Sequence, residues 1–252
     1  MTTLLKTNQD TYPYFCDGQP MSDNTEQYRW IVIIKENLEI MFAAIADVFI
    51  AGDLFWSPVK GQINTLKTAP DVMVVFGRPK GKRLSYIQHE EGNIAPQVVF
   101  EIRSPGNKPK EMLEKFDFYQ QYGVEEYYLY DPHDFVLDGW KRRGNRLEPI
   151  LMMNGWVSPR LGIRFVQTTE DLELYRPDGR KFLTTLELEQ EREQERQRAE
   201  QAESRAEQAE SRAEQERQLR EQTEQQLEQA RQQRQRLIEH LKALNIDPDT
   251  LG

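Results

Sequence analysis

Three short apolar runs constrain the fold of this 252-residue chain more than any other feature. They are residues 71–76 (Asp-Val-Met-Val-Val-Phe), 97–103 (Gln-Val-Val-Phe-Glu-Ile-Arg) and 126–130 (Glu-Tyr-Tyr-Leu-Tyr). Short runs rich in β-branched and aromatic residues are typical of strands, and a nearly continuous apolar run is typical of a strand covered on both faces. The pattern predicts a central sheet in an α/β domain.

Two stretches have the periodicity of helices that bury one face. From about Glu26 to Ala46 apolar residues recur at intervals of three and four, and the same spacing covers residues 108–122, where Gly123 is suited to a C-cap. We therefore predict a helix before the first apolar run and another after the second. Three residues are plausible N-caps of the first helix: Ser22, Asp23 and Asn24.

Further strand signals lie on either side of the central runs. Residues 48–56 predict a strand, and residues 135–140 and 146–150 flank a turn at 143–145, which is typical of a hairpin. Residues 151–180 alternate strand-like pieces with turns, and we interpret most of this stretch as sheet edge.

After about residue 181 the chain changes to Glu, Gln, Arg and Ala, with a seven-residue repeat at 198–204 and 205–211. This period predicts a long helix able to form a coiled coil. Its apolar seam begins with alanines and continues through Glu216, Arg220 and Arg234, so pairing should be weak or depend on a partner. Dimerisation or spacing and a passive tail both stay open. We expect one domain over residues 1–180 and the helix over 181–252.

The charge balance limits how the chain can bind a nucleic acid. The net charge is −9, and neither part is basic: residues 1–180 hold 21 Lys and Arg against 25 Asp and Glu, and residues 181–252 hold 12 against 17. A nucleic-acid substrate would need a local basic patch. The candidates, which a merely solvated surface would also explain, are Lys80, Lys82 and Arg83 in a polar loop, and Lys141, Arg142 and Arg143 in the hairpin.

Cysteine and histidine are too few to suggest a stabilising crosslink or metal site. Cys16 is the single cysteine and only three histidines occur, so neither an internal disulfide nor a structural zinc site is expected. The first residues lack the apolar core of a signal peptide, and no apolar run approaches the ~20 residues of a membrane span. We expect a cytoplasmic protein without a membrane partner.

Asp71, Glu101 and Lys115 are the candidate catalytic residues. Glu101 interrupts a strand that is otherwise apolar, where an unpaired carboxylate would cost several kcal/mol. Two carboxylates on neighbouring strands can hold Mg²⁺ or Mn²⁺, and a nearby lysine can position water or stabilise charge on a phosphate. The alternatives are that Glu101 pairs with Arg103 or sits at an exposed strand end.

Several motifs occur together in one order. They are Pro70-Asp71 with its apolar continuation, residues 98–105, residues 123–132, and Lys115 with Glu111 four residues before it and Tyr119 four residues after it. Over roughly residues 14–140 this combination resembles the Uma-two-like family of restriction endonucleases, within the PD-(D/E)xK nuclease superfamily.

The resemblance implies a restriction-endonuclease-like core, a central mixed sheet flanked by helices, that cleaves DNA with Mg²⁺ or Mn²⁺. It implies that Asp71 and Glu101 ligate the metal and that Lys115 takes the role of the superfamily lysine, whose usual position holds Arg103. Arg103, Glu111 and Tyr119 are candidate supporting residues. Family members often carry a glutamate before an Asp-Gly turn and a histidine at the start of the first helix, where this chain offers Tyr14 and Gln27.

Two functions follow from these expectations. One is a metal-dependent DNA endonuclease with a C-terminal helix for homodimerisation or another coiled-coil partner. The alternative is a non-catalytic interaction protein that keeps the nuclease fold as a docking module.

Overall fold

The computed structural model describes residue 22 and residues 24–60 and 66–243, so the expectations for Tyr14 and Cys16 lie outside the described residues. The chain divides into two compact units, residues 1–188 and residues 189–252. Each unit is described by itself.

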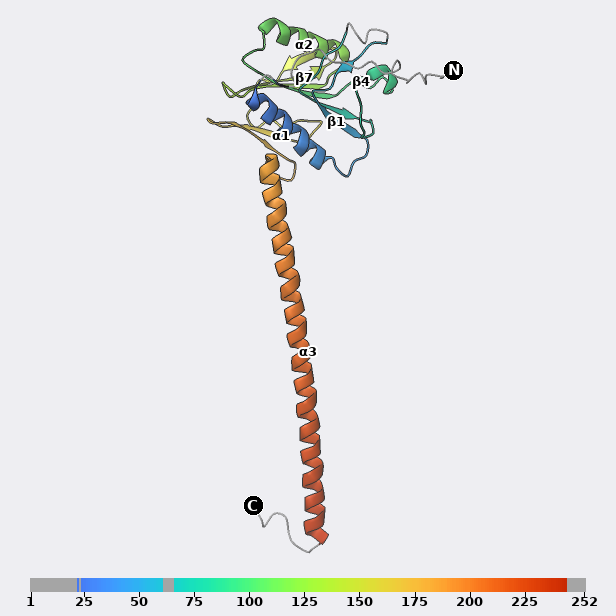
Figure 1. Cartoon of the computed structure of the whole chain (residues 1–252), viewed down its shortest axis with the longest axis vertical. Helices are drawn as coiled ribbons and strands as arrows, with labels where there is room; N and C mark the ends of the chain where they lie inside the picture. Colours follow the sequence, from blue (N-terminus) through green and yellow to red (C-terminus); the bar gives the residue numbers. More distant parts are fainter. Residues whose placement is uncertain (1–21, 23, 61–65, 244–252) are drawn as a thin grey trace, which may run out of the picture. The chain divides into compact units, whose positions relative to one another are not determined.

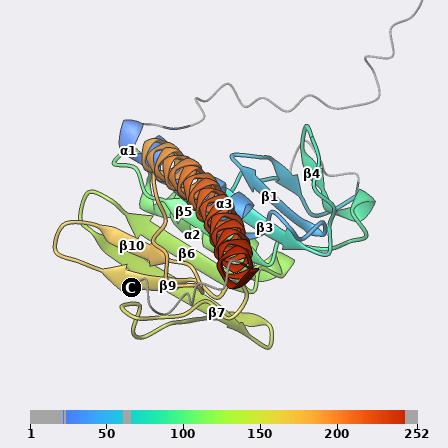
Figure 2. The ribbon, with the colours of Figure 1, turned by 90° about the horizontal axis from the view of Figure 1, so that it is seen from below.

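A mixed six-stranded sheet forms the centre of the first unit. Its order is β1-β3-β5-β6-β7-β8, in which β5 and β6 are parallel and all other neighbours are antiparallel (Figure 2). The predicted α/β class with a central mixed sheet is therefore confirmed. The strands are β1 (Val48–Gly52), β3 (Val72–Phe76), β5 (Val98–Ile102), β6 (Glu126–Asp131), β7 (Val136–Arg143) and β8 (Arg146–Pro149).

Two helices cover opposite faces of this sheet (Figure 1). Helix α1 (Thr25–Met41) is capped by Asn24, whose side chain accepts a hydrogen bond from the Gln27 amide at 2.8 Å. Helix α2 (Pro109–Tyr122) ends at Gly123, which has the left-handed φ of 97° that glycine adopts at little cost. The predicted extension of the first helix to Ala46 is wrong, because the chain turns after Met41 to enter β1.

The central strands are buried on both faces, which explains their continuous apolar character. In β3 and β5 one set of side chains packs under α1 and the alternate set packs under α2. The α1 set is Val72, Val74, Val98, Phe100 and Ile102, and the α2 set is Met73, Val75 and Val99. By this alternation Asp71 and Glu101 both belong to the α2 face.

The predicted strand over residues 48–56 begins at residue 48 as expected but is shorter, because the chain turns before residue 56 and starts a second strand there. Strand β1 ends at Gly52, and Asp53 follows with a left-handed φ of 46° that redirects the chain. Strand β2 (Trp56–Ser57) then pairs in parallel with β4 (Tyr86–Ile87), which leads into the short 3-10 helix η1 (Gln88–Glu90).

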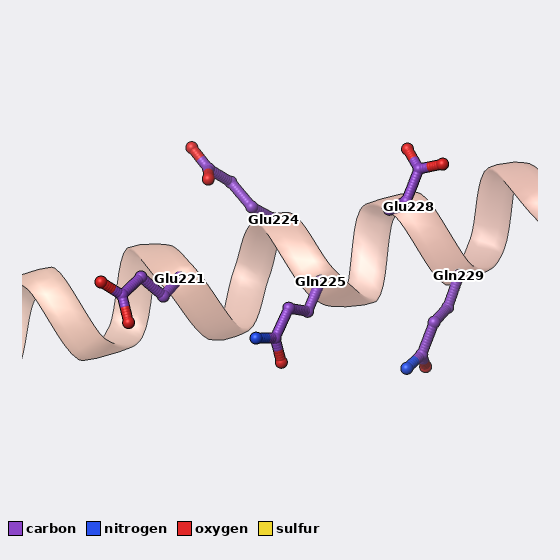
Figure 3. Close-up of a pocket in the computed structure, with 5 residues that line it drawn as sticks. All are labelled: Glu221, Glu224, Gln225, Glu228 and Gln229. Carbon is purple, nitrogen blue, oxygen red and sulfur yellow. The ribbon is translucent and has the colours of Figure 1, made fainter.

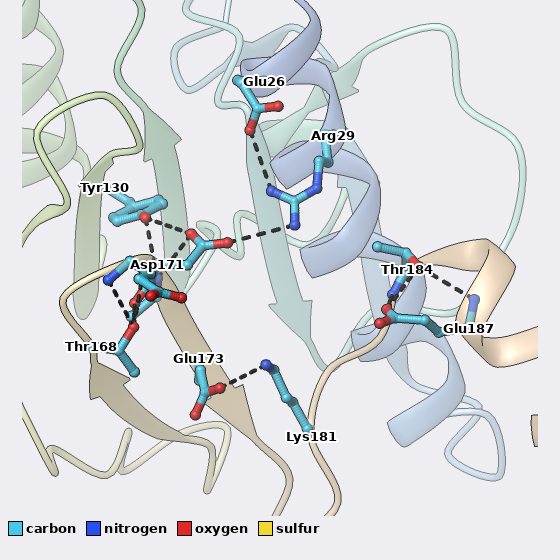
Figure 4. Close-up of polar contacts among 11 residues, drawn as sticks. Glu26, Arg29, Tyr130, Thr168, Asp171, Glu173, Lys181, Thr184 and Glu187 are labelled. Carbon is cyan, nitrogen blue, oxygen red and sulfur yellow. Dashed lines mark hydrogen bonds and ion pairs between the residues drawn. The ribbon is translucent and has the colours of Figure 1, made fainter.

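Residues 151–180 contain strand-like pieces as predicted, but these do not form the edge of the central sheet. Strands β9 (Arg164–Gln167) and β10 (Leu172–Tyr175) form a separate two-stranded sheet, and Phe165 and Leu174 are buried in the same core as α1. Polar contacts join this sheet to its neighbours. Asp171 accepts a 2.9 Å hydrogen bond from the Tyr130 hydroxyl and lies 3.5 Å from the Arg29 guanidinium of α1 (Figure 4).

Asn37 ties α1 to the end of the first unit. Its side chain is fully buried, and its amide nitrogen donates to the carbonyl of Ile33 at 2.8 Å and to that of Leu183 at 2.7 Å. Its amide oxygen accepts from the Leu183 amide at 3.2 Å and from the Arg176 guanidinium at 2.9 Å. One α1 side chain therefore holds residues 176–183 in place.

Helix α3 (Thr185–Ala243) begins with a capping box. The Thr184 hydroxyl accepts from the Glu187 amide, and the Glu187 carboxylate accepts from the Thr184 amide at 2.8 Å (Figure 4). Almost every described side chain beyond residue 188 is exposed. The residues grouped around Glu224 project from this helix alone and enclose no cavity (Figure 3). Among the described residues, no helix is both long and apolar enough to cross a membrane.

Candidate active site

The fold brings Asp71 opposite Glu101 at one end of the sheet. Strands β3 and β5 pair with Val72 opposite Phe100, and extending this register by one residue sets Asp71 opposite Glu101. Cross-strand neighbours project from the same face. The two carboxylates, only 5% and 2% exposed, therefore face α2 together.

Three hydrogen bonds from described residues hold the Asp71 carboxylate. Its Oδ2 accepts from the backbone amide of Ile102 at 2.6 Å, and both oxygens lie 3.4 Å from Nε2 of Gln27. Gln27 comes from the first turn of α1. The helix-start position that the resemblance singled out thus contacts one of the predicted metal ligands.

Helix α2 supplies both partners of Glu101. The Lys115 ammonium lies 2.7 Å from Oε2 of Glu101, and the Tyr119 hydroxyl donates to Oε1. Residues four apart lie on one face of a helix, which brings both side chains to the same carboxylate. The predicted alternatives for Glu101 are wrong: it is buried, and Arg103 pairs instead with Asp131 at 3.3 Å.

The protonation of Asp71 and Lys115 follows from burial and mutual charge. Burial, followed by the charge of Glu101, raises the pKa of Asp71 to about 7. Burial by itself would lower the pKa of Lys115, but the carboxylates of Glu101 and Asp71 reverse this and leave that pKa above its usual value. Lys115 is therefore a permanent cation at neutral pH and acts as a hydrogen-bond donor rather than a base.

Two tyrosines close the inner side of the site. Burial and the charge of Glu101 hold the pKa of Tyr119 well above its usual range, so this hydroxyl stays a donor. The Tyr127 hydroxyl is buried without a hydrogen-bond partner among the described residues, and burial with the charges of Glu101 and Asp71 raises its pKa as well. Tyr127 was not predicted, because an aromatic residue in a buried strand carries no signal beyond packing.

The donor set fits a hard divalent cation. Within the described residues no cluster of three or more His, Cys, Asp or Glu occurs, so the two carboxylates form the candidate ligand pair. A carboxylate offers about four acceptor positions, so both groups retain free lone pairs beside their present bonds. Their mutual repulsion in a buried setting is what a bound cation would relieve.

Glu111 remains close to the site without a direct contact to the carboxylates. It lies one helical turn before Lys115, and its charge contributes to the raised pKa of that lysine. Its side chain is exposed.

The predicted basic loop lies far from the carboxylates. Lys80 donates to the carbonyl of Phe42 at 2.8 Å, just beyond the C-terminus of α1, whereas Gln27 marks the opposite end of that helix. The separation is roughly 20 Å at 1.5 Å per helical residue. Arg83 donates to Glu91 at 2.6 Å, so two of the three predicted basic groups make internal contacts, and Lys82 is exposed.

The basic hairpin is also displaced from the site. In the strand register, Lys141 lies opposite Glu126 of β6, and Glu101 lies beside Leu129 of β6. Glu126 and Leu129 are three residues apart, which is about 10 Å along the strand. Arg142 donates to the carbonyls of Val124 and Gln120 and so caps the end of α2. Arg143 is exposed and pairs with Glu148 at 3.3 Å.

Other basic residues lie at the same end of the sheet as the carboxylates. The loop between β5 and α2 joins the strand of Glu101 to the helix of Lys115 and carries Arg103 and Lys108, and Lys110 follows in the first turn of α2; all three are exposed. Sequence reasoning did not select Lys108 and Lys110. The sequence signal that could have identified them is that both lysines lie between Glu101 and Lys115.

The central mixed sheet flanked by two helices is the architecture of the restriction-endonuclease-like fold class. The family model Uma2, described as "Putative restriction endonuclease", matches residues 20–201. The match spans more than half of the chain, and the chain belongs to this family. No curated protein matches it.

The chain is also similar to the crystal structure of a protein described as a "putative nuclease belonging to DUF820" from Anabaena variabilis ATCC 29413. The sequence identity is 14% and the TM-score is 0.41. The similarity covers 58% of this chain and 79% of the other.

Proposed function

We propose that this chain is a DNA endonuclease that depends on Mg²⁺ or Mn²⁺. The observation that carries the proposal is the convergence of Asp71, Glu101 and Lys115 at one buried end of the sheet, from three separate elements. Membership of a restriction endonuclease family supports the same reaction. A divalent cation held by Asp71 and Glu101 would polarise the phosphate and lower the pKa of an attacking water.

The chain's own residues prepare the reaction by fixing charges. The Ile102 amide and Gln27 orient Asp71, while Lys115 and Tyr119 orient Glu101 from two directions. Because Lys115 remains protonated, its role is to orient the water and to stabilise negative charge that develops on the phosphate.

The exposed loop between β5 and α2, together with the first turn of α2, is the proposed contact for the DNA backbone. Arg103, Lys108 and Lys110 project near the end of β5 that carries Glu101, and such side chains bind phosphate without reading sequence. They would supply the local positive charge that an acidic chain needs. The earlier candidates Lys80, Arg83 and Arg142 contribute to folding through their internal contacts.

Plasmid nicking in Mg²⁺ and in Mn²⁺ tests the proposal. Asp71→Asn, Glu101→Gln and Lys115→Met keep side-chain size and should each lower the rate by about two orders of magnitude or more. Glu148→Gln and Lys181→Met change the same residue types at exposed positions and should leave the rate unchanged. Equal rates in all variants would contradict the assignment, as would a folded wild type that cuts no DNA substrate.

One observation favours the alternative, a non-catalytic nuclease-fold protein that assembles through its C-terminal helix. Both oxygens of Glu101 already bond to Lys115 and Tyr119, which makes a self-contained buried pair. Calorimetric titration with Mn²⁺ separates the two functions. The nuclease proposal expects one site that Asp71→Asn and Glu101→Gln abolish, whereas a docking module would bind no metal there.

A further inference from the structure

We propose that two copies of α3 pair in an antiparallel arrangement in which Glu216 of each copy meets Arg220 of the other. The pairing concerns this helix alone and does not depend on nuclease activity. The surface involved is the seam, which we define as the positions three and four residues apart that run from Ala199 to Leu237. It consists of Ala199, Ala202, Ala206, Ala209, Ala213, Glu216, Arg220, Thr223, Leu227, Ala230, Arg234 and Leu237.

The seam is a continuous stripe on the exposed helix. Successive members are three or four residues apart over about 60 Å at 1.5 Å per residue, which is the spacing of a coiled-coil interface. Leu227 and Leu237 are 52% and 67% exposed, a large exposure for leucine. The sequence positions of the polar side chains Glu221, Glu224, Gln225, Glu228 and Gln229, which are drawn in Figure 3, fall outside the seam.

Three charged residues in the seam exclude the parallel, in-register pair. That arrangement sets every seam residue against its own copy, so Glu216 would meet Glu216, Arg220 would meet Arg220 and Arg234 would meet Arg234. Like charges in direct opposition at an interface destabilise it. A parallel pair would contain three such contacts within the seam.

The antiparallel pair centred next to Gln218 reverses this balance. Glu216 then meets Arg220 of the other copy, and by symmetry the contact occurs twice. Neither residue has an ion-pair partner among the described residues, whereas Arg217 beside them is paired with Glu214 at 3.4 Å and Glu221 at 3.7 Å. The charges that break the seam of one helix thus become complementary between two copies.

The same register also matches side-chain size. Ala209 meets Leu227, and Ala199 meets Leu237, so a small residue faces a large one at each end of the seam. Arg234 meets Ala202, which leaves room for the long side chain to reach solvent. The two copies of Leu219, 65% exposed and adjacent to the seam, come together near the centre. Within the seam, the charged residues that weaken a parallel zipper thus face an opposite charge or a smaller side chain.

Disulfide crosslinking of the full chain tests the orientation, with Cys16→Ser removing the native thiol. Ala209→Cys and Leu227→Cys are made separately, one of them with a size tag. A mixture of the two variants should give roughly tenfold more crosslinked dimer than either variant alone. In the antiparallel pair each cysteine lies about 27 Å from the same cysteine of the other copy, which is too far for a disulfide. Ser211→Cys, off the seam, is the matched control and should not crosslink.

Sedimentation equilibrium of the full chain gives the second test. The wild type should be a dimer, Glu216→Arg should weaken dimerisation about tenfold or more, and adding Arg220→Glu should restore it. Circular dichroism checks that helix content is unchanged. A monomeric wild type, crosslinking of each single cysteine variant to itself, or failure of the double exchange to restore the dimer would overturn the proposal.

Discussion

The ammonium of Lys115 in helix α2 lies 2.7 Å from the carboxylate of Glu101 in strand β5, and only 3% of the Glu101 side chain is exposed. Lys115 also lies 3.4 Å from the carbonyl of Ala69, just before Asp71. One cation therefore connects the two strands that carry the carboxylates.

Lys115→Met should destabilise the first unit more than Glu101→Gln does. Removing the lysine leaves a buried carboxylate without its cation, at a cost of about 3 kcal/mol, whereas Lys115 is 21% exposed and can turn partly to water when Glu101 is neutral. The double variant should be less destabilised than the sum of the two. Urea unfolding of all four proteins measures this coupling, and strictly additive free energies of unfolding would contradict the buried pair.

Tyr119→Phe should remove a hydrogen bond to Glu101 while the aromatic packing stays. The Tyr119 hydroxyl is fully buried, so we expect a loss of about 1–3 kcal/mol in the free energy of unfolding. Nicking should also slow if Tyr119 orients Glu101. Tyr122→Phe is the control, because that hydroxyl makes an exposed contact with Gln121. Equal losses in the two variants would contradict the assignment.

Stability should fall in acid through Glu91. Hydrogen bonds from Arg83, and then from Arg78, lower the pKa of Glu91 below 4.5, so this carboxylate stabilises the folded state above about pH 4.5 and the contribution disappears as pH falls through the lowered pKa. Glu91→Gln should therefore be less stable than wild type at pH 6, with the difference shrinking below pH 4. Urea unfolding over this range measures it, and Glu90→Gln, which removes an exposed neighbouring carboxylate, is the control. Equal pH-dependent differences in the two variants would contradict the assignment to Glu91.

Lys108→Ala with Lys110→Ala should weaken DNA binding regardless of sequence. Each lost phosphate contact should reduce the slope of log affinity against log salt by about one. The matched double variant is Lys82→Ala with Lys141→Ala, which removes the same charge far from the carboxylates and should bind nearly as wild type. Fluorescence anisotropy in EDTA measures both without cleavage. A larger effect of the second pair would place the DNA at the other end of the sheet.

Much of the core was predictable because burial leaves a direct mark on sequence. Continuous apolar runs identified β3, β5 and β6, and the interruption by Glu101 marked the buried carboxylate before any contact was known. The C-cap glycine fixed the end of α2 for the same local reason. Such signals depend on neighbouring residues in the chain.

A prediction failed where the structure depends on contacts between residues that are distant in sequence. Residues 164–175 contain short strands that resemble sheet edge, and only their packing against the α1 core shows that they form a second sheet. The sequence also could not place the basic residues in the loop after β3 and in the hairpin, which strand direction puts at the end of the sheet away from Asp71; their contact with phosphate stays a prediction. Local composition carries no information about which sheet end a loop occupies.

The buried side chain of Asn37 bonds to the backbone of Leu183, 146 residues later in the chain. On the ribosome, α1 therefore emerges long before the segment that satisfies its buried amide. The nascent first unit cannot complete its native hydrogen bonds until residue 183 has left the exit tunnel, and it can then fold while the α3 sequence is still being synthesised. A chain that ends at Arg180 would lack this last partner, so a stable first unit should extend at least to Leu183.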